Sequence, residues 1–224
     1  MEFDVITIFP EILKSYLAEA QIGRAIRKKL IKINIHNLRD YTSDRHKTTD
    51  DIPYGGGAGM IMKIEPIFKN IQALLKKQKK RSKTRIILLS AKGQLYNQKK
   101  ATQLTKKYDR LIFICGRYEG VDERVAQKLV DEEISIGPYV LSGGELGALI
   151  IIDSVTRLLP GVLGNQASLK DESYNNDQTE YPQYTRPEKF QDWSVPKVLL
   201  SGNPKLISQW RKSKQKNFKT LIKE

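Results

Sequence analysis

Hydrophobic and polar positions along the chain form strand-like and helix-like patterns in turn. Residues 3–9 are mostly β-branched and aromatic and stop at Pro10, which predicts a buried strand followed by a helix over 11–18. In residues 30–38, isoleucines alternate with polar residues, which predicts a half-buried strand. Its isoleucines are expected to face the core, and His36 is expected on the solvated face.

Further along, apolar residues recur at helical spacing over residues 64–78 and predict a helix that buries one face. Short apolar runs at 85–89 and 111–115 predict buried strands. Residues 146–159 are apolar nearly all round, which predicts a helix buried in the core or at a subunit interface. Strands that alternate with helices are typical of an α/β fold with a mainly parallel sheet.

Six of the fifteen glycines lie between residues 114 and 147, with Pro138 among them. Glycine lets another backbone or a ligand approach closely, so these loops suggest a small-molecule cradle; the alternative is that the glycines only shape turns. No phosphate-binding glycine pattern is present. In a doubly wound sheet, ligands bind at the carboxyl ends of the strands, so loops 90–93, 116–120 and 136–144 are expected to converge there.

Charge is the next informative property. The 224 residues carry a formal net charge of +14, and the segment from Pro66 to Tyr108 has thirteen basic residues and no acidic one. Like charges this dense repel one another unless a polyanion neutralises them, which favours contact with phosphates over a merely solvated basic face, although charge alone does not separate nucleic acid from an acidic membrane surface. No apolar run is long enough for a membrane span, the start is unlike a signal peptide, and the single Cys115 excludes an internal disulfide. A cytoplasmic protein is therefore expected.

Two segments lack a core pattern. Residues 39–60 are too long for a structureless connection and are expected to be functional, although His46 and two aspartates give no metal-ligand geometry. Residues 160–176 are polar and read as a linker, and 181–224 as a small helical domain with a helix from about residue 205. This domain is expected to grip RNA phosphate; the alternative is an appendage that stabilises a dimer.

The glycine-rich loops carry a resemblance. Residues 116–124 (GRYEGVDER), 135–137 (SIG) and 139–146 (YVLSGGEL) closely resemble the bacterial tRNA (guanine-N1)-methyltransferases of the knotted SPOUT superfamily, which modify position 37 beside the anticodon. Further matches follow in the same order at 53–60, 160–164 and 184–187. The resemblance implies an α/β fold with a deep trefoil knot in the 116–144 region and a small C-terminal α-helical domain. The expected boundaries are 1–160 for the knotted methyltransferase domain, 161–176 for the linker and 177–224 for the tRNA-binding domain.

The activity implied is transfer of the methyl group of S-adenosylmethionine to N1 of guanosine 37 in tRNA. A guanidinium can stabilise negative charge on the guanine oxygen, and the resemblance gives this role to Arg157, for which a structural salt bridge is the alternative. The target base is assigned to Asp50, Gly59, Glu119 and Arg186. The cofactor is assigned to Leu88, Leu89, Ser90, Gly93, Gly116, Tyr118, Glu119, Gly120, Ile136, Gly137, Pro138, Tyr139, Val140, Leu141, Gly143 and Gly144.

The general base is where the chain departs from the family. Many members carry Asp-Ser-Phe upstream of Tyr-Thr-Arg-Pro, whereas the corresponding position here reads Glu172-Ser173-Tyr174, preceded by Asp171. Glu172 is the first candidate for the catalytic base and Asp171 the second. The resemblance also implies a homodimer whose sites are built from both chains, and it suggests a divalent ion such as Mg²⁺, for which the sequence shows no ligand set.

Two rival functions remain. One is a related knotted methyltransferase that acts on another RNA position or on a ribose hydroxyl; the Tyr184-to-Pro187 motif and the basic C-terminal domain argue against it. The other is a basic RNA-binding protein without catalysis, which would not need three converging glycine-rich loops. Cofactor binding and the dependence on guanosine 37 separate these hypotheses.

Overall fold

The structure, a computed structural model, describes residues 1–76, 83–164, 173–174 and 178–217. The chain divides into two compact units, Met1–Gly164 and Asn165–Glu224. Among the described residues, no helix is both long enough and apolar enough to cross a lipid bilayer.

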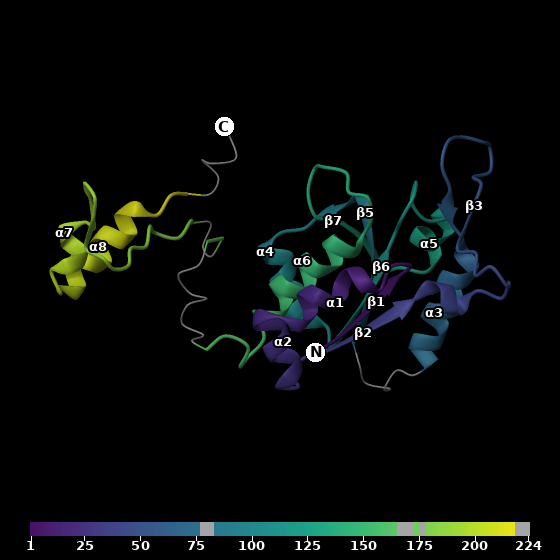
Figure 1. Ribbon diagram of the computed structural model, residues 1–224, viewed down its shortest axis with the longest axis horizontal. Coiled ribbons are helices and arrows are strands. Elements are labelled where there is room, and N and C mark those ends of the chain that lie inside the picture. Colours follow the sequence, from purple (N-terminus) through teal and green to yellow (C-terminus); the bar gives the residue numbers. More distant parts are fainter. Residues whose placement is uncertain (77–82, 165–172, 175–177, 218–224) are drawn as a thin grey trace. The chain divides into compact units, whose positions relative to one another are not determined.

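A five-stranded sheet forms the centre of the first unit (Figure 1). Its strand order is β2-β1-β6-β5-β7, and each strand runs parallel to its neighbours. The predicted α/β fold with a mainly parallel sheet is therefore confirmed. The strands are β1 (Glu2–Thr7), β2 (Lys32–Asn37), β5 (Thr84–Leu95), β6 (Arg110–Cys115) and β7 (Glu132–Ser135).

Helices cover both faces of this sheet, because its central strand is apolar on both sides. In β6, Leu111, Phe113 and Cys115 point into one core, and Ile112 and Ile114 point into the other. The first core is closed by α1 (Glu11–Ala18), α2 (Ala20–Arg27), α4 (Gln98–Lys107) and α6 (Glu145–Thr156), and the second by α3 (Ile64–Lys76) and α5 (Glu123–Lys128).

The strand predicted over 85–89 is longer than expected. β5 continues to Leu95, and Ile134 of β7 pairs with both Leu89 and Gln94. The four residues between these two positions therefore bulge out of the ladder. The loop expected at 90–93 is a bulge within one strand, and it stands at the edge of the sheet where the other glycine-rich loops begin.

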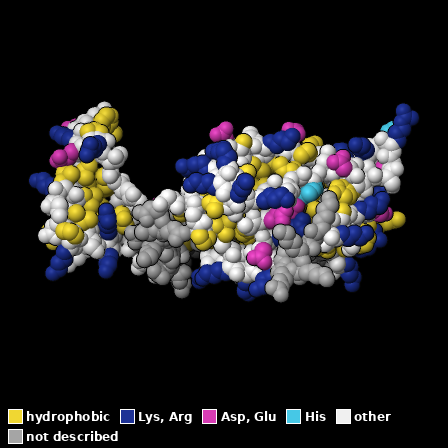
Figure 2. Space-filling model, turned by 90° about the horizontal axis from the view of Figure 1, so that it is seen from below, with side chains coloured by type: hydrophobic (Ala, Val, Ile, Leu, Met, Phe, Trp, Pro, Cys, Tyr) yellow, Lys and Arg dark blue, Asp and Glu magenta, His cyan; other side chains and the backbone are white. Residues whose placement is uncertain are grey.

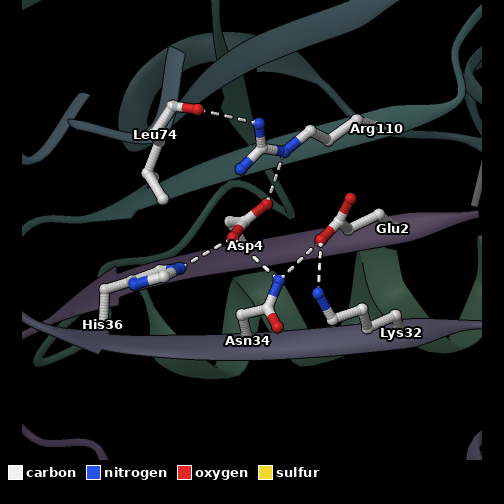
Figure 3. A network of polar contacts seen from close by, with 7 residues as sticks. All are labelled: Glu2, Asp4, Lys32, Asn34, His36, Leu74 and Arg110. Atoms are coloured by element: carbon white, nitrogen blue, oxygen red, sulfur yellow. Dashed lines mark hydrogen bonds and ion pairs between the residues drawn. The ribbon is translucent and has the colours of Figure 1, made fainter. Parts of the chain in front are cut away.

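An ionic network around a buried carboxylate joins β1, β2 and β6 (Figure 3). The Asp4 carboxylate is fully buried and accepts a hydrogen bond from Arg110 Nε at 2.7 Å, while Arg110 Nη1 donates to the Leu74 carbonyl at 3.1 Å. His36 Nε2 lies 2.7 Å from the other Asp4 oxygen, and its side chain is 19% exposed. The expectation of a solvated His36 is therefore wrong, because a carboxylate on the neighbouring strand holds the ring against the sheet.

Replacing Asp4 by Asn is expected to lower the free energy of unfolding by about 3–5 kcal/mol, because it leaves the buried Arg110 guanidinium without its counter-ion. Chemical denaturation at neutral pH measures the loss. The matched control is Asp51→Asn, since Asp51 is an exposed carboxylate 3.9 Å from Lys63; it should change stability by less than about 0.5 kcal/mol. Equal stability of the Asp4 variant and the wild type would contradict the role given to this network.

The same carboxylate predicts a dependence of stability on pH. Burial alone would raise the pKa of Asp4, but hydrogen bonds from His36 and Arg110 outweigh burial, and the pKa lies below its ordinary value. The stabilisation that ionised Asp4 provides is therefore complete above its unfolded-state pKa of about 3.9. It is lost as the pH falls through the folded-state pKa. Denaturation curves between neutral and acid pH should show this loss in the wild type and lack it in Asp4→Asn.

The segment 39–60 has structure of its own. It begins in the short helix η1 (Leu38–Tyr41) and enters an antiparallel pair of strands, β3 (Asp50–Asp51) and β4 (Ile61–Met62). The glycine run 55–59 forms the tip of this hairpin, where four glycines have positive φ angles.

The second unit contains the hairpin β8 (Lys189–Phe190) and β9 (Trp193–Ser194), followed by α7 (Lys197–Leu200) and α8 (Pro204–Lys214). Its ends are joined by a bridge between Gln178 and Asn217 and by a hydrogen bond from the Thr179 amide to the Lys216 carbonyl at 2.9 Å. None of its described residues is buried, so the unit has no core of its own among them.

Candidate functional site

A pocket of about 430 Å³ opens beside the carboxyl ends of β5, β6 and β7. This volume lies within the range of about 300–1,000 Å³ that small-molecule sites occupy. Three segments line it, namely the bulge of β5, the loop after β6 and the loop after β7. These are the loops that the sequence predicted to converge, and they converge because parallel strands end at one edge of the sheet.

Thirteen of the sixteen residues assigned to the cofactor line this pocket. Gly93, Gly137 and Pro138 belong to the same segments but do not line it. At Gly93 a Cβ atom would lie 2.5 Å from the backbone of Glu133, so this glycine serves the close approach of β5 to β7. The thirteen lining residues are Leu88, Leu89, Ser90, Gly116, Tyr118, Glu119, Gly120, Ile136, Tyr139, Val140, Leu141, Gly143 and Gly144.

An ion pair fastens two of these loops together. Arg117 Nη2 lies 2.9 Å from Glu145 Oε2, and Arg117 Nη1 donates to the Ser142 carbonyl at 3.2 Å. Glu145 is only 1% exposed, and it also accepts a hydrogen bond from the Thr7 hydroxyl at 2.6 Å. The amide of Gly144 donates to the Gly116 carbonyl at 3.0 Å. The loop after β6 is thus held against the start of α6 and the end of β1.

Sequence reasoning missed Arg117 and Glu145, although one signal was available. Glu145 is the single carboxylate in the first turn of a helix whose next seven residues are all apolar. Such a group favours the positive end of the helix dipole and needs a partner when it is buried.

Some of the charged side chains that line the pocket have a partner, and one carboxylate oxygen has none among the described residues. Lys92 Nζ lies 2.9 Å from Glu123 Oε2, and this hydrogen bond lowers the pKa of Glu123 and raises the pKa of Lys92. Glu133 also lines the pocket, and its buried Oε2 has no hydrogen-bond partner among the described residues. A ligand with hydrogen-bond donors or a positive charge would satisfy this oxygen. Glu133 is a candidate that sequence reasoning missed.

The hairpin tip of the segment 39–60 meets the pocket at Glu119. The Glu119 amide donates to the Met60 carbonyl at 3.1 Å, and the Met62 amide donates to the Gly120 carbonyl at 3.0 Å. Gly59 has a φ of +83°, and a Cβ atom there would lie 2.6 Å from the Glu119 side chain. Gly59 and Glu119, both assigned to the target base, are therefore in direct contact. Asp50 does not line the pocket and accepts a hydrogen bond from the Thr49 hydroxyl at 3.3 Å.

The structure does not bring every predicted residue to the pocket. Arg157 directly follows α6, whose opposite end carries Gly147 of the pocket lining. Arg157 is not among the residues that line the pocket, and ten residues of helix, a rise of about 15 Å, separate it from Gly147. Arg186 is exposed in the second unit, and Glu172 and Asp171 lie outside the described residues.

The described basic residues between Pro66 and Tyr108 do not form one continuous surface. The sheet separates α3 from α4, so their lysines lie on opposite sides of the first unit. Arg85 and Lys100 both pair with Glu132, which belongs to β7. Acidic residues from outside the segment therefore neutralise part of the charge that the sequence suggested for RNA.

No group of three or more His, Cys, Asp or Glu side chains is arranged to hold a metal ion within the described part of the chain.

Comparisons with known proteins give the family. A family model described as tRNA (Guanine-1)-methyltransferase TrmD matches residues 1–223. The tRNA (guanine-N(1)-)-methyltransferase of Carboxydothermus hydrogenoformans is 51% identical over 223 residues, which are 100% of this chain and 85% of that one. The enzyme of the same name from Dictyoglomus turgidum is 50% identical over 223 residues, or 100% of this chain and 88% of that one.

A solved structure agrees with these matches. The crystal structure of tRNA (m1G37) methyltransferase from Aquifex aeolicus is similar with a TM-score of 0.78 and 40% identity, covering 94% of this chain and 87% of that one. The resemblance found in the glycine-rich loops is therefore confirmed over the full length of the chain. The chain belongs to the tRNA (guanine-1)-methyltransferase family.

Proposed function

We propose that this protein transfers the methyl group of S-adenosylmethionine to N1 of guanosine 37 in tRNA. The observation that carries the proposal is the pocket in which three glycine-rich loops meet at the carboxyl edge of the sheet, in a chain of the methyltransferase family. A non-catalytic RNA-binding protein would have no use for such a pocket. A knotted methyltransferase with another RNA target is the nearer rival. The identity of the methylated nucleotide distinguishes the two activities.

The pocket suits S-adenosylmethionine in shape and charge. The walls contain aliphatic side chains such as Leu89 and Ile136, which suit the apolar parts of the cofactor. The carboxylate of Glu133 is available for the positively charged part of the cofactor or for its hydroxyl and amino groups. The bound cofactor supplies an activated methyl group and a good leaving group, so the protein has to position the base, remove its proton and stabilise its charge.

The residues of this chain divide these tasks. Glu119 lies beside Gly59 at the mouth of the pocket, where its carboxylate can accept hydrogen bonds from the polar edge of a guanine. The Arg157 guanidinium is proposed to donate to the guanine oxygen and to stabilise the negative charge that develops there. The proton on N1 is proposed to pass to a carboxylate, with Glu172 as the first candidate and Asp171 as the alternative.

We also propose a homodimer with composite sites, and two observations support it. Arg157 does not line the pocket of its own chain and follows Gly147 by about 15 Å of helical rise, which favours a role at a partner's pocket. In addition, α1 and α6, which contact each other, leave large apolar side chains exposed. Patches of this kind on a soluble surface mark interaction sites. The exposed side chains are Ile12, Tyr16, Leu146 and Ile150.

The remaining family features are part of the same proposal. The trefoil knot would involve the region 116–144, and the close contacts of residues 116–117 with 142–145 are compatible with a chain threaded there. The second unit would bind tRNA, and the protein would act in the cytoplasm. A divalent ion such as Mg²⁺ is proposed on family grounds, and no step of the reaction is assigned to it.

The experiment that tests the proposed function uses labelled S-adenosylmethionine and two tRNA transcripts that differ only at nucleotide 37. Label should enter the transcript with guanosine 37 and not the transcript with adenosine at that position. Digestion to nucleosides should then recover the label in 1-methylguanosine. Label on both transcripts would favour another RNA target, and cofactor binding without any transfer would contradict the proposed reaction.

Replacing Glu133 by Gln is expected to weaken cofactor binding by about tenfold, because a hydrogen bond to a charged group contributes about 1.5 kcal/mol or more. Isothermal titration calorimetry measures the affinity for S-adenosylmethionine and for S-adenosylhomocysteine, which lacks the sulfonium charge. A larger loss for the charged cofactor would place Glu133 near the sulfonium. The matched control is Glu132→Gln on the same strand, whose side chain pairs with Arg85 instead; equal losses in both variants would refute a specific role for Glu133.

A further inference from the structure

The second unit exposes a pair of aromatic side chains, Phe190 and Trp193. Trp193 is 70% exposed and Phe190 is 57% exposed. The two rings lie 6.0 Å apart at an interplanar angle of 42°. Exposed aromatic side chains of this size are costly to leave in water, and they are enriched where proteins bind partners.

The hairpin that carries these rings holds them in place. Phe190 and Trp193 are opposite each other in the β8–β9 ladder, so both side chains project from the same face. The Val195 amide donates to the Glu188 carbonyl at 2.9 Å and extends the ladder by one further bond. A ligand that contacts both rings would therefore meet a surface that is ordered before binding.

The charge around the pair indicates what kind of ligand fits. Among the described residues 178–217 of this unit, eight are basic and three are acidic, namely Glu180, Glu188 and Asp192. Figure 2 shows hydrophobic side chains exposed on this unit, surrounded mainly by lysine and arginine side chains and by a few acidic ones. A second protein chain would need an acidic surface to match, whereas single-stranded RNA offers both phosphates and the flat faces of bases.

We propose that Phe190 and Trp193 form a stacking platform for an unpaired base of tRNA, while basic side chains of the same unit contact the adjoining phosphates. The proposal rests on the proposed tRNA substrate, and it adds a second contact with RNA that is separate from the pocket of the first unit. The platform is a binding surface and takes no part in the transfer of the methyl group. It should therefore affect the affinity for tRNA and leave the affinity for the cofactor unchanged.

Three substitutions at Trp193 distinguish stacking from simple apolar burial. Trp193→Ala removes the ring and should weaken tRNA binding by about 5- to 100-fold, because stacking on an aromatic side chain contributes about 1–3 kcal/mol per base. Trp193→Phe keeps a π face and should restore most of this affinity. Trp193→Leu keeps apolar area without a π face and should bind as weakly as Trp193→Ala. The matched control is Leu200→Ala, which removes another half-exposed apolar side chain of the same unit and should bind tRNA normally.

Fluorescence gives a readout that does not depend on methyl transfer. The chain has two tryptophans, so Trp210→Phe leaves Trp193 as the single reporter. Unmodified tRNA should quench this emission, and S-adenosylmethionine should not. The proposal is overturned if tRNA binds without quenching or if Trp193→Leu binds tRNA like the wild type. It is also overturned if Trp193→Ala changes the oligomeric state instead of the affinity for tRNA. Failure of the methylation assay with the wild type would instead contradict the proposed reaction.

Discussion

Replacing Glu172 by Gln is expected to lower kcat by about 10²–10⁴-fold, the usual contribution of a positioned general base. The proton on N1 of guanine does not leave readily at neutral pH, and glutamine keeps the size of the side chain but cannot accept a proton. Single-turnover methyl transfer with saturating cofactor and tRNA measures the chemical step directly. The affinities for both ligands should stay close to those of the wild type, because the substitution removes only a charge.

Asp171→Asn is the matched control for this substitution. Both changes replace a carboxylate by its amide, one residue apart, so a general effect of charge would appear in both variants. Loss of turnover in Glu172→Gln alone would identify Glu172 as the base, and loss in Asp171→Asn alone would identify Asp171. Full turnover in both variants would mean that neither residue removes the proton. The pH profile provides a second check, since the rate of the active enzyme should fall at acid pH as the base becomes protonated, and the impaired variant should lack this dependence.

Replacing Arg157 by Ala is expected to lower kcat by about 10²–10³-fold, as is typical when a donor to a developing oxyanion is lost. Arg157 does not line the pocket of its own chain and follows Gly147 by about 15 Å of helical rise, which makes a sharper prediction possible. If the guanidinium serves the partner's pocket, an Arg157→Ala chain still contributes an intact pocket. When this variant chain pairs with a chain that still has Arg157, the dimer should contain one complete active site.

A mixing experiment tests this arrangement. Ser90 lines the pocket in the bulge of β5, so Ser90→Trp should block cofactor binding while Arg157 stays intact. Each variant alone should be nearly inactive. After random reassociation, heterodimers carry one intact site, and the mixture should recover about a quarter of the wild-type activity in a two-fold symmetric dimer. Analytical ultracentrifugation confirms the dimers, and dimers that recover no activity would contradict the composite site. If Arg157 serves its own chain, no heterodimer has a complete site.

Local patterns in the sequence identified much of the fold. The predicted helix over 11–18 coincides with α1, and the predicted strand over 111–115 matches β6 within one residue. Both follow from a periodicity of side chains that neighbouring residues determine among themselves. The glycine-rich segments were recognisable for the same reason, because their composition and spacing are local properties. Their convergence at one edge followed from the parallel sheet that the alternation of strands and helices implied.

Local patterns did not predict which residues from distant parts of the chain contact each other. His36 looked like a solvated residue because its partner, Asp4, lies on another strand 32 residues away. The apolar helix over 146–159 was expected to be buried in the core or at a subunit interface, and Leu146 and Ile150 are exposed in a single chain. A pattern of apolar residues shows that a face has to be covered, but it does not show which surface covers it.

The sequence by itself therefore determined the fold class, the family and the loops that build the pocket, because each of these depends on periodicity or on motifs read along the chain. Only the tertiary structure decided that Arg117 pairs with Glu145, that Glu133 lines the pocket with a buried oxygen that has no hydrogen-bond partner among the described residues, and that Arg157 does not line it. These relations depend on strand order, register and the length of α6. They are fixed when the chain packs, since side chains far apart in sequence then have to satisfy one another's charges and hydrogen bonds.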